Sequence, residues 1–261
     1  MSATSTIQDK SLWNSNKVIQ EYATADYLSK PEQTILQGLK PSLPGMRMLD
    51  LGIGGGRTTL HFAPHVKEYV GSDYAENMID ACLKRFPNPE PNTRFEVIDA
   101  RKMSGVPDGY YDLVLFSFNG LDSVPTEDRH KVLEEVKRVG KPGGQFVFSS
   151  HNLRYIRKMY ALKLHKQWRV FLYQFYRTFM LIYYNGLPSK YDQKDFAVLR
   201  NGAEHFSLDI YYGKPEFQVR QLQEAGFRNI RAFSLRSGEE IKADKLRQDT
   251  EDAWIYYQCE I

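Results

Sequence analysis

Short apolar runs alternate with amphipathic segments along residues 46–150, and this alternation restricts the possible folds more than any other feature of the sequence. The runs have the length of buried strands, whereas the segments between them place apolar residues three and four positions apart, as helices do. We expect strands at 46–51, 68–72, 94–98, 112–117 and 144–150. We expect helices at 57–65, 75–86 and 126–139. Strands that alternate with helices form a parallel sheet covered on both faces, so we predict a doubly wound α/β fold.

The alternation stops at residue 151. Residues 153–184 instead carry apolar side chains at steps of three and four, which predicts one long or two consecutive amphipathic helices. A further helix is expected at 215–225, and two closing strands are expected at 228–235 and 253–260. The long helical segment is therefore an insert between the fifth and sixth strands of the sheet.

The expected elements divide the chain into four parts. The pattern of residues 10–40 predicts two helices, the second beginning near Pro31. The insert is expected to form a lid over the substrate. The four parts are an N-terminal helical cap (1–40), a core (41–150), a helical lid insert (151–212) and a C-terminal part of the core (213–261).

The composition excludes several classes of protein. The 261 residues are 42% hydrophobic and 26% charged, as in globular domains and unlike disordered chains or coiled coils. No apolar run approaches the length of a transmembrane helix, and residues 1–12 lack the apolar centre of a secretory signal. Cys82 and Cys259 are the two cysteines and lie far apart, so we expect no disulfide, no zinc site and a cytoplasmic location.

Positive charge is concentrated in the insert. Residues 151–191 contain eight lysines and arginines and no acidic residue, although the net charge of the whole chain is only +3. Two interpretations stay open: the basic face is solvated and lies against an acidic body, or it attracts an anionic substrate to the site. We expect the large aromatic side chains of the insert to turn toward the cleft or the body, namely Trp168, Phe171, Phe175 and Phe179.

Residues 49–59, LDLGIGGGRTT, give the strongest functional signal. A buried strand ends near Asp50 and leads into a glycine-rich loop, whose backbone can turn sharply and approach a ligand without a Cβ in the way. A dinucleotide site would have the spacing G-x-G-x-x-G, but Arg57 stands where the third glycine belongs. The pattern D-x-G-x-G-G-G instead resembles the first motif of the class I S-adenosylmethionine-dependent methyltransferases, and the resemblance covers about residues 35–150 and 205–261.

The resemblance implies a Rossmann-like sheet of seven strands, six parallel and the last, at about 253–260, antiparallel. It also implies that the core at 41–150 binds S-adenosylmethionine and releases S-adenosylhomocysteine. In that family the glycine loop packs against the methionine part of the cofactor, which assigns cofactor contacts to Asp50, Gly52, Gly54 and Gly56.

Asp73 ends the second expected strand, 19 residues after Gly54. A carboxylate there offers two acceptor oxygens for the two ribose hydroxyls, and the resemblance assigns this role to Asp73, with Tyr74 and Met78 flanking the ribose and adenine. The alternative is that Asp73 caps the helix that begins near Ala75, and both roles are compatible.

Asp99 ends the third expected strand. The resemblance implies that Asp99 accepts a hydrogen bond from the adenine amino group and that the backbone N–H of Ala100 meets the ring. The alternative is an ordinary aspartate in the turn after a strand.

The fourth expected strand ends in FSFNGLD, residues 116–122, where ligands bind in such sheets. Phe116 and Phe118 are candidates to lie against the sulfonium, because an aromatic face attracts positive charge. Strand alternation puts both on one face, so the alternative is that one or both belong to the core. This tip differs from the N/D-P-P-Y/F motif of amino-methyltransferases acting on DNA bases. We expect Tyr22, Asn119 and His151 to line the acceptor pocket, with His151 as a general base if the acceptor is a hydroxyl. A capping or core histidine is the alternative for His151.

Together these features predict a methyltransferase that acts on an N or O atom of a small-molecule metabolite, either anionic or aromatic and natural-product-like. A protein, peptide or RNA acceptor is the alternative, favoured only by the basic insert, and an NAD-dependent oxidoreductase is a distant one that leaves Asp99 unexplained. His61 and His65 lack the H-E-x-x-H pattern, so we predict no metal site. The sequence carries no signal for the oligomeric state.

Overall fold

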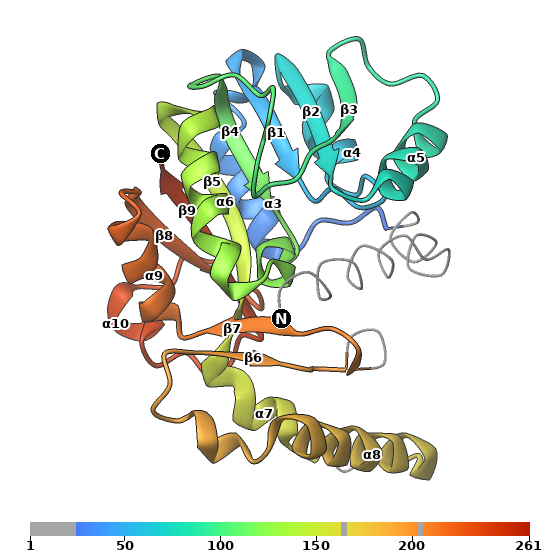
Figure 1. The fold of residues 1–261 in the computed structure, drawn as a ribbon, viewed down its shortest axis with the longest axis vertical. Coiled ribbons are helices and arrows are strands. Elements are labelled where there is room, and N and C mark those ends of the chain that lie inside the picture. Colours follow the sequence, from blue (N-terminus) through green and yellow to red (C-terminus); the bar gives the residue numbers. More distant parts are fainter. Residues whose placement is uncertain (1–24, 163–165, 203–205) are drawn as a thin grey trace.

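A nine-stranded mixed sheet organises the chain (Figure 1), as seen in the computed structural model, which describes residues 25–162, 166–202 and 206–261. The strands are β1 (Arg47–Leu51), β2 (Glu68–Asp73), β3 (Thr93–Val97), β4 (Tyr111–Phe116), β5 (Gly140–Asn152), β6 (Phe196–Leu199), β7 (Ile210–Gly213), β8 (Arg228–Ser234) and β9 (Trp254–Glu260). The α-helices are α3 (Lys30–Leu39), α4 (Thr59–Phe62), α5 (Glu76–Arg85), α6 (Arg129–Val139), α7 (Ile156–Tyr160), α8 (Trp168–Asn185), α9 (Pro215–Glu224) and α10 (Ala243–Leu246). Short 3-10 turns lie at Leu43–Gly45, Ala63–His65, Gly120–Ser123, Thr126–Asp128, Leu153–Tyr155 and Pro188–Tyr191.

Seven of these strands form the sheet that the resemblance implies. Strands β3, β2, β1, β4 and β5 are adjacent in that order and parallel. The last strand, β9, lies between β5 and β8 and is antiparallel to both. The predicted mixed sheet with an antiparallel last strand is therefore confirmed.

Helices cover both faces of this sheet because the strand residues alternate between two apolar clusters. Along β4, Leu113 and Leu115 belong to one cluster and Val114 and Phe116 to the other. The first cluster includes Ile35 of α3, and the second includes α6 and α9 residues such as Val136. Strand alternation with period two thus directs each apolar side chain toward a helical layer.

The insert differs from its prediction as a purely helical lid. Residues 196–199 and 210–213 form β6 and β7, an antiparallel hairpin whose β7 pairs with the end of β5. Burial alternates along β6, with Ala197 and Leu199 buried and Phe196 and Val198 exposed. The short run FAVL therefore follows the two-residue period of a strand, which the helical reading of the insert overlooked.

Helix α8 packs through a different face from the one expected. Leu181 and Asn185 are its buried residues, whereas Trp168, Phe175 and Phe179 are 66%, 56% and 58% exposed. The prediction that these three rings turn toward the cleft or the body is wrong. Apolar residues occupy more than one face of α8, so their periodicity predicts a helix without selecting the face that packs.

Figure 1 shows α8 at one end of the molecule, beyond the β6–β7 hairpin. Among the residues the structure describes, no helix combines the length and apolar character needed to cross a bilayer.

The packing of α8 predicts effects of very different size for two neighbouring truncations. Leu181→Ala removes a fully buried side chain from the apolar cluster of the insert and is expected to lower the free energy of unfolding by about 2–5 kcal/mol. Phe179→Ala removes an exposed ring and is expected to change it by less than about 0.5 kcal/mol. Urea unfolding of both variants measures the difference, and a larger loss for Phe179→Ala would contradict the packing.

Candidate functional site

A cavity of about 350 Å³ opens at the carboxyl edge of the sheet, within the size range of small-ligand sites. It lies between the ends of β1, β2 and β4 and is bounded by the loops that follow them. Most residues predicted to bind the cofactor are among those that line it: Asp50, Gly52, Gly54, Asp73, Tyr74, Met78, Asp99, Ala100 and Phe116.

The loop after β1 turns through glycines that no other residue would replace without strain. Gly52 has φ 62°, and a Cβ there would lie 2.7 Å from Cε2 of Phe116. Gly56 has φ 78°, and its missing Cβ leaves room for Phe86 behind the loop. Gly56 is outside the described lining of the cavity, so its place in the structure is that of a turn residue.

Asp50 anchors the start of this loop. Its Oδ2 accepts hydrogen bonds from Thr58 Oγ1 at 2.5 Å and from Tyr69 Oη at 2.6 Å. Complete burial raises the pKa of the Asp50 carboxyl to about 6, although both hydrogen bonds favour the ionised form. The structure therefore gives Asp50 one partner directly before α4 and one on β2, and its predicted contact with the cofactor stays a prediction.

Asp73 connects the ends of β1 and β2. Its Oδ2 accepts from the backbone N–H of Gly54 at 3.1 Å, and its Oδ1 accepts from that of Ala75 at 3.0 Å. Burial raises the pKa of this carboxyl. Asp73 thus holds the glycine loop and the start of α5 while it lines the cavity, which is compatible with both of its predicted roles.

Asp99 pairs with Arg101, which the sequence interpretation missed. Arg101 Nη2 lies 2.7 Å from Asp99 Oδ2, and the Arg101 backbone N–H donates to Oδ1 at 2.9 Å. Burial acts to raise the pKa of Asp99, but these hydrogen bonds outweigh it and lower the pKa. Both residues line the cavity. A ligand that contacts Asp99 would therefore contact a carboxylate whose orientation is fixed by the Arg101 guanidinium.

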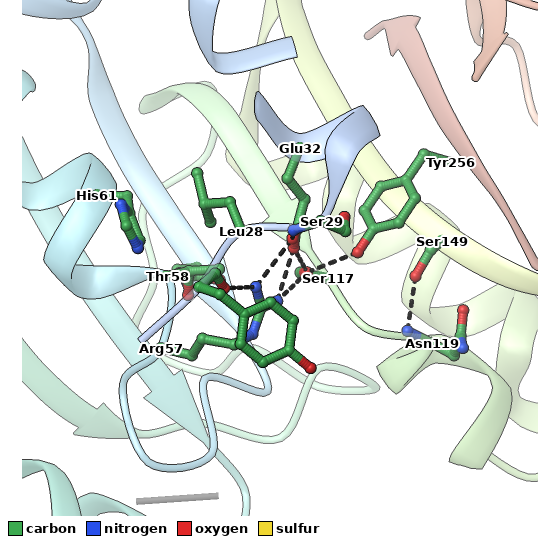
Figure 2. Close-up of polar contacts among 12 residues, drawn as sticks. Leu28, Ser29, Glu32, Arg57, Thr58, His61, Ser117, Asn119, Ser149 and Tyr256 are labelled. Atoms are coloured by element: carbon green, nitrogen blue, oxygen red, sulfur yellow. Dashed lines mark hydrogen bonds and ion pairs between the residues drawn. The ribbon is translucent and has the colours of Figure 1, made fainter. Parts of the chain in front are cut away.

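Arg57 forms a buried ion pair with Glu32 of α3, shown in Figure 2. Its Nη1 donates to Oε2 at 2.8 Å and its Nη2 to Oε1 at 2.6 Å. Nη2 also donates to Ser117 Oγ at 2.9 Å, after the end of β4. Burial acts to raise the pKa of Glu32, but the bonds from Arg57 outweigh it and keep the pKa low.

The sequence singled out Arg57 only as a departure from the dinucleotide motif. No local pattern links it to Glu32, because 25 residues separate the two. Its guanidinium also lies 5.1 Å from the ring centre of Phe118, so one side chain joins the glycine loop, α3 and the tip of β4.

The tip of β4 has unusual backbone angles. Phe118 and Asn119 have φ 53° and 63°, in the left-handed region that residues other than glycine rarely occupy. The Asn119 N–H donates to Ser149 Oγ of β5 at 2.7 Å, which holds this conformation. Buried Asn119 Oδ1 has no hydrogen-bond partner within the described parts of the chain.

His151 lies next to Asn119, and the predicted role of both residues in an acceptor pocket stays a prediction. His151 Nε2 is 3.4 Å from Asn119 Nδ2, and His151 Nδ1 is 2.8 Å from Asp122 Oδ2. Arg129 Nη1 lies 2.9 Å from Oδ1 of the fully buried Asp122 carboxylate. Asp122 and Arg129 were missed, because only the folded chain brings Asp122 beside the end of β5.

The pair of Asn119 and His151 lies beside the cavity. Neither belongs to its described lining, which includes their neighbours Phe118 and Gly120. The Trp254 ring stands between the two regions, 5.8 Å from the centre of Phe118 and 6.0 Å from that of His151. Tyr22, the third predicted acceptor residue, lies outside the described residues.

Potential metal ligands are dispersed. No three His, Cys, Asp or Glu side chains gather into a metal-binding group among the described residues. His61 Nε2 instead lies 2.7 Å from the backbone oxygen of Asp26.

The raised pKa of Asp50 predicts a pH-dependent contribution to stability. Because this pKa rises from 3.8 to about 6 on folding, Asp50 stabilises the fold fully below about pH 4, and this contribution is lost as the pH rises through 6. Asp50→Asn cannot titrate. The free energy of unfolding of the wild type minus that of Asp50→Asn should therefore fall from pH 4 to 7, by about 1.4 kcal/mol per unit of pKa shift. Urea unfolding at several pH values measures it, and parallel profiles would contradict the assignment.

Comparisons with known proteins show the family of the chain. Residues 48–144 match the family model described as a methyltransferase domain. The demethylmenaquinone methyltransferase of Staphylococcus aureus (strain JH9) is 30% identical over 200 residues, covering 74% of this chain and 73% of that protein.

Solved structures share the fold. A S-adenosylmethionine-dependent methyltransferase from Clostridium acetobutylicum ATCC 824 matches with a TM-score of 0.60 and 15% identity over 89% of this chain and 91% of its own. A SAM-dependent methyltransferase from Aquifex aeolicus matches with a TM-score of 0.56 and 16% identity over 94% and 97%. With the glycine loop and the seven-stranded sheet, these matches confirm the resemblance: the chain belongs to the class I methyltransferases that use S-adenosylmethionine as cofactor.

Proposed function

We propose that this methyltransferase acts on an N or O atom of an aromatic small molecule that carries no negative charge. The observation that supports this most directly is the wall of the cavity at the tip of β4, which presents Phe116 and Phe118, with Trp254 against Phe118. The Staphylococcus aureus relative is named for demethylmenaquinone, which is a small molecule.

The charges around the cavity favour an acceptor without a carboxylate or phosphate. Arg57 and Arg101 line the cavity, but each is ion-paired with a carboxylate, Glu32 and Asp99 respectively. Breaking the Arg57 pair to bind an anion would leave the buried Glu32 carboxylate unpaired, which is costly. The Asp99 side chain is 40% exposed, so freeing Arg101 would cost less. We therefore favour the aromatic over the anionic alternative.

The cavity fits S-adenosylmethionine through Asp73. Its carboxylate is buried and accepts two backbone N–H groups, but it forms no salt bridge with any described cation, so further donors such as ribose hydroxyls would stabilise it. The glycine loop, Tyr74, Met78 and Ala100 would surround the rest of the cofactor. When bound, S-adenosylmethionine supplies an electrophilic methyl group on a positively charged sulfur, and the face of Phe116 would favour that charge.

The pair of His151 and Asp122 supports proton removal from the acceptor. An ionised Asp122 can only accept a hydrogen bond, so its contact with Nδ1 fixes the proton on that nitrogen and leaves Nε2 as the basic atom. Nε2 faces Asn119, whose neighbours line the cavity. Asp122 is therefore proposed as a positioning residue for the base His151.

A protein or peptide acceptor, or an RNA, remains an alternative that the basic insert favours. Arg154, Arg157 and Lys158 of that insert are already paired with Glu216, Asp192 and Glu251. This pairing agrees with a solvated basic face that lies against acidic residues. A small molecule is thus the better supported acceptor.

Cofactor affinity tests the role of Asp73. Asp73→Ala would leave two ribose hydroxyls without their acceptor in a largely dry cavity, at a cost of roughly 1–3 kcal/mol, so S-adenosylmethionine is expected to bind about tenfold to more than a hundredfold more weakly. Asp99→Ala should weaken it less, because an amino group at the adenine edge can reach water. Calorimetric titration of both variants measures this, with the thermal midpoint as a control for folding. Equal affinity in Asp73→Ala and the wild type would leave Asp73 with only its backbone contacts.

Turnover tests the role of His151. With a hydroxyl acceptor, His151→Ala is expected to lower kcat by roughly 10²–10⁴ because the base is lost. Asp122→Asn should lower kcat in the same direction and change its pH profile, since the proton is no longer fixed on Nδ1. Both variants should bind S-adenosylmethionine as the wild type does.

The assay follows formation of S-adenosylhomocysteine with a panel of aromatic hydroxyl and amine acceptors. With an amine acceptor that arrives deprotonated, His151→Ala should change kcat only slightly. Full turnover of a hydroxyl acceptor by His151→Ala would remove the base assignment, and product formation only with peptides or RNA would replace the proposed acceptor class.

A further inference from the structure

We propose that helix α8 is a docking surface for membranes that carry anionic phospholipids. The surface is one stripe of exposed apolar side chains along the helix, which we call the α8 stripe. Its residues are Trp168, Leu172, Phe175, Tyr176, Phe179, Ile182 and Tyr183.

The stripe is continuous. Successive members lie one, three or four positions apart, which places them on one face of a helix about 27 Å long. Each is between 39% and 71% exposed, and none carries a charge. A monomer seldom leaves such a large contiguous apolar surface in water, so the stripe indicates a site of interaction.

The orientation of α8 is fixed by its other face. Leu181 is fully buried, Asn185 Nδ2 donates to the Arg200 carbonyl at 3.0 Å, and Arg177 Nη1 donates to the Met159 carbonyl at 2.9 Å. Rotating α8 to bury the stripe would expose Leu181 and break these bonds. The exposed stripe is therefore a consequence of how the insert packs.

The composition of the stripe suits the boundary between lipid and water. Trp and Tyr have an apolar ring and a polar tip, and they concentrate at that boundary in membrane proteins. A helix with an apolar face lies in the plane of the interface and buries that face at the level of the headgroups and upper acyl chains. Three of the seven members are Trp or Tyr, and the remaining four are Leu, Ile or Phe.

The charges beside the stripe select an anionic surface. Lys166 and Arg169 lie at the first end of α8 and Lys190 follows its last turn, and none of them makes a salt bridge with a described residue. Residues 151–191 contain no Asp or Glu, so nothing within this segment repels a negatively charged headgroup. Juxtaposed basic residues and an apolar helix face together attract acidic lipid.

The same charges disfavour two other occupants. A second copy packed stripe to stripe would bring these unpaired cations near one another without acidic partners from this segment. Binding to single-stranded nucleic acid would require cations along the whole row of aromatic rings. Arg169 lies over the Trp168 ring at one end, but among the described residues no cation lies over the rings of the other stripe members.

Vesicle sedimentation tests the proposal on the full chain. We expect the protein to sediment with vesicles of equal parts phosphatidylcholine and phosphatidylglycerol, and much less with phosphatidylcholine alone. The triple variant Trp168→Ser, Phe175→Ser, Phe179→Ser should bind the anionic vesicles at least about tenfold more weakly, because each ring loses its place in the interface. Added salt should weaken the wild type because it screens the headgroup charge.

Matched controls separate the stripe from general surface effects. Leu83→Ser with Val97→Ser changes exposed apolar residues elsewhere and should leave vesicle binding unchanged. Lys166→Glu with Arg169→Glu should weaken binding to anionic vesicles, whereas Lys67→Glu with Lys84→Glu, which reverses exposed charges elsewhere, should not. All variants should keep the thermal midpoint and the cofactor affinity of the wild type, since none of these residues lines the cavity.

Three results would overturn the proposal. One is the absence of binding to anionic vesicles by the wild type, or equal binding by the stripe variant and its control. Another is a dimer in light scattering that the stripe variant dissociates, which would assign the surface to a second copy. The third is tighter binding of a single-stranded RNA oligomer than of vesicles, lost in the same variant.

Discussion

The buried ion pair between Arg57 and Glu32 holds together the elements that form the cavity. The guanidinium belongs to the glycine loop, the carboxylate to α3, and Ser117, which donates to Glu32 and accepts from Arg57, follows the end of β4. Ser117 Oγ also lies 3.3 Å from Tyr256 Oη of β9. Removing either charge would leave the other buried and unpaired. The positions of the glycine loop, of α3 and of the tip of β4 therefore depend on the same ion pair.

The tip of β4 connects the two halves of the site. On one side Phe116 and Phe118 line the cavity, and on the other Asn119 adjoins His151. The left-handed conformations at Phe118 and Asn119 are unfavourable by themselves and persist because Ser149 binds the Asn119 N–H. Strained backbone of this kind is concentrated where side chains must be aimed at a ligand. The strain thus lies at the boundary between the cofactor cavity and the proposed base.

The sequence predicted the features that short-range patterns determine. The parallel strands β1 to β5 were predicted because they are apolar runs, whereas β6 and β7 were not predicted. Asp73 and Asp99 were singled out because they lie at the ends of such runs. The contacts between distant residues were not predictable in this way: Glu32 with Arg57, and Asp122 with His151, join segments 25 and 29 residues apart. The prediction of the face through which α8 packs was wrong for a related reason. A helix that is apolar on several faces has no periodic pattern that indicates which face packs against the core.

The two apolar faces of α8 have different physical consequences. The face that contains Leu181 contributes to the fold, because its burial accompanies folding of the insert. The α8 stripe leaves between 39% and 71% of each of its side chains exposed to water, so its apolar surface contributes less to the fold than Leu181 does. In Figure 1 the strands β1 and β2 point toward the end of the molecule at which α8 lies. An apolar aromatic acceptor partitions into bilayers, and an enzyme that rests on the bilayer through α8 would meet such an acceptor at its highest local concentration.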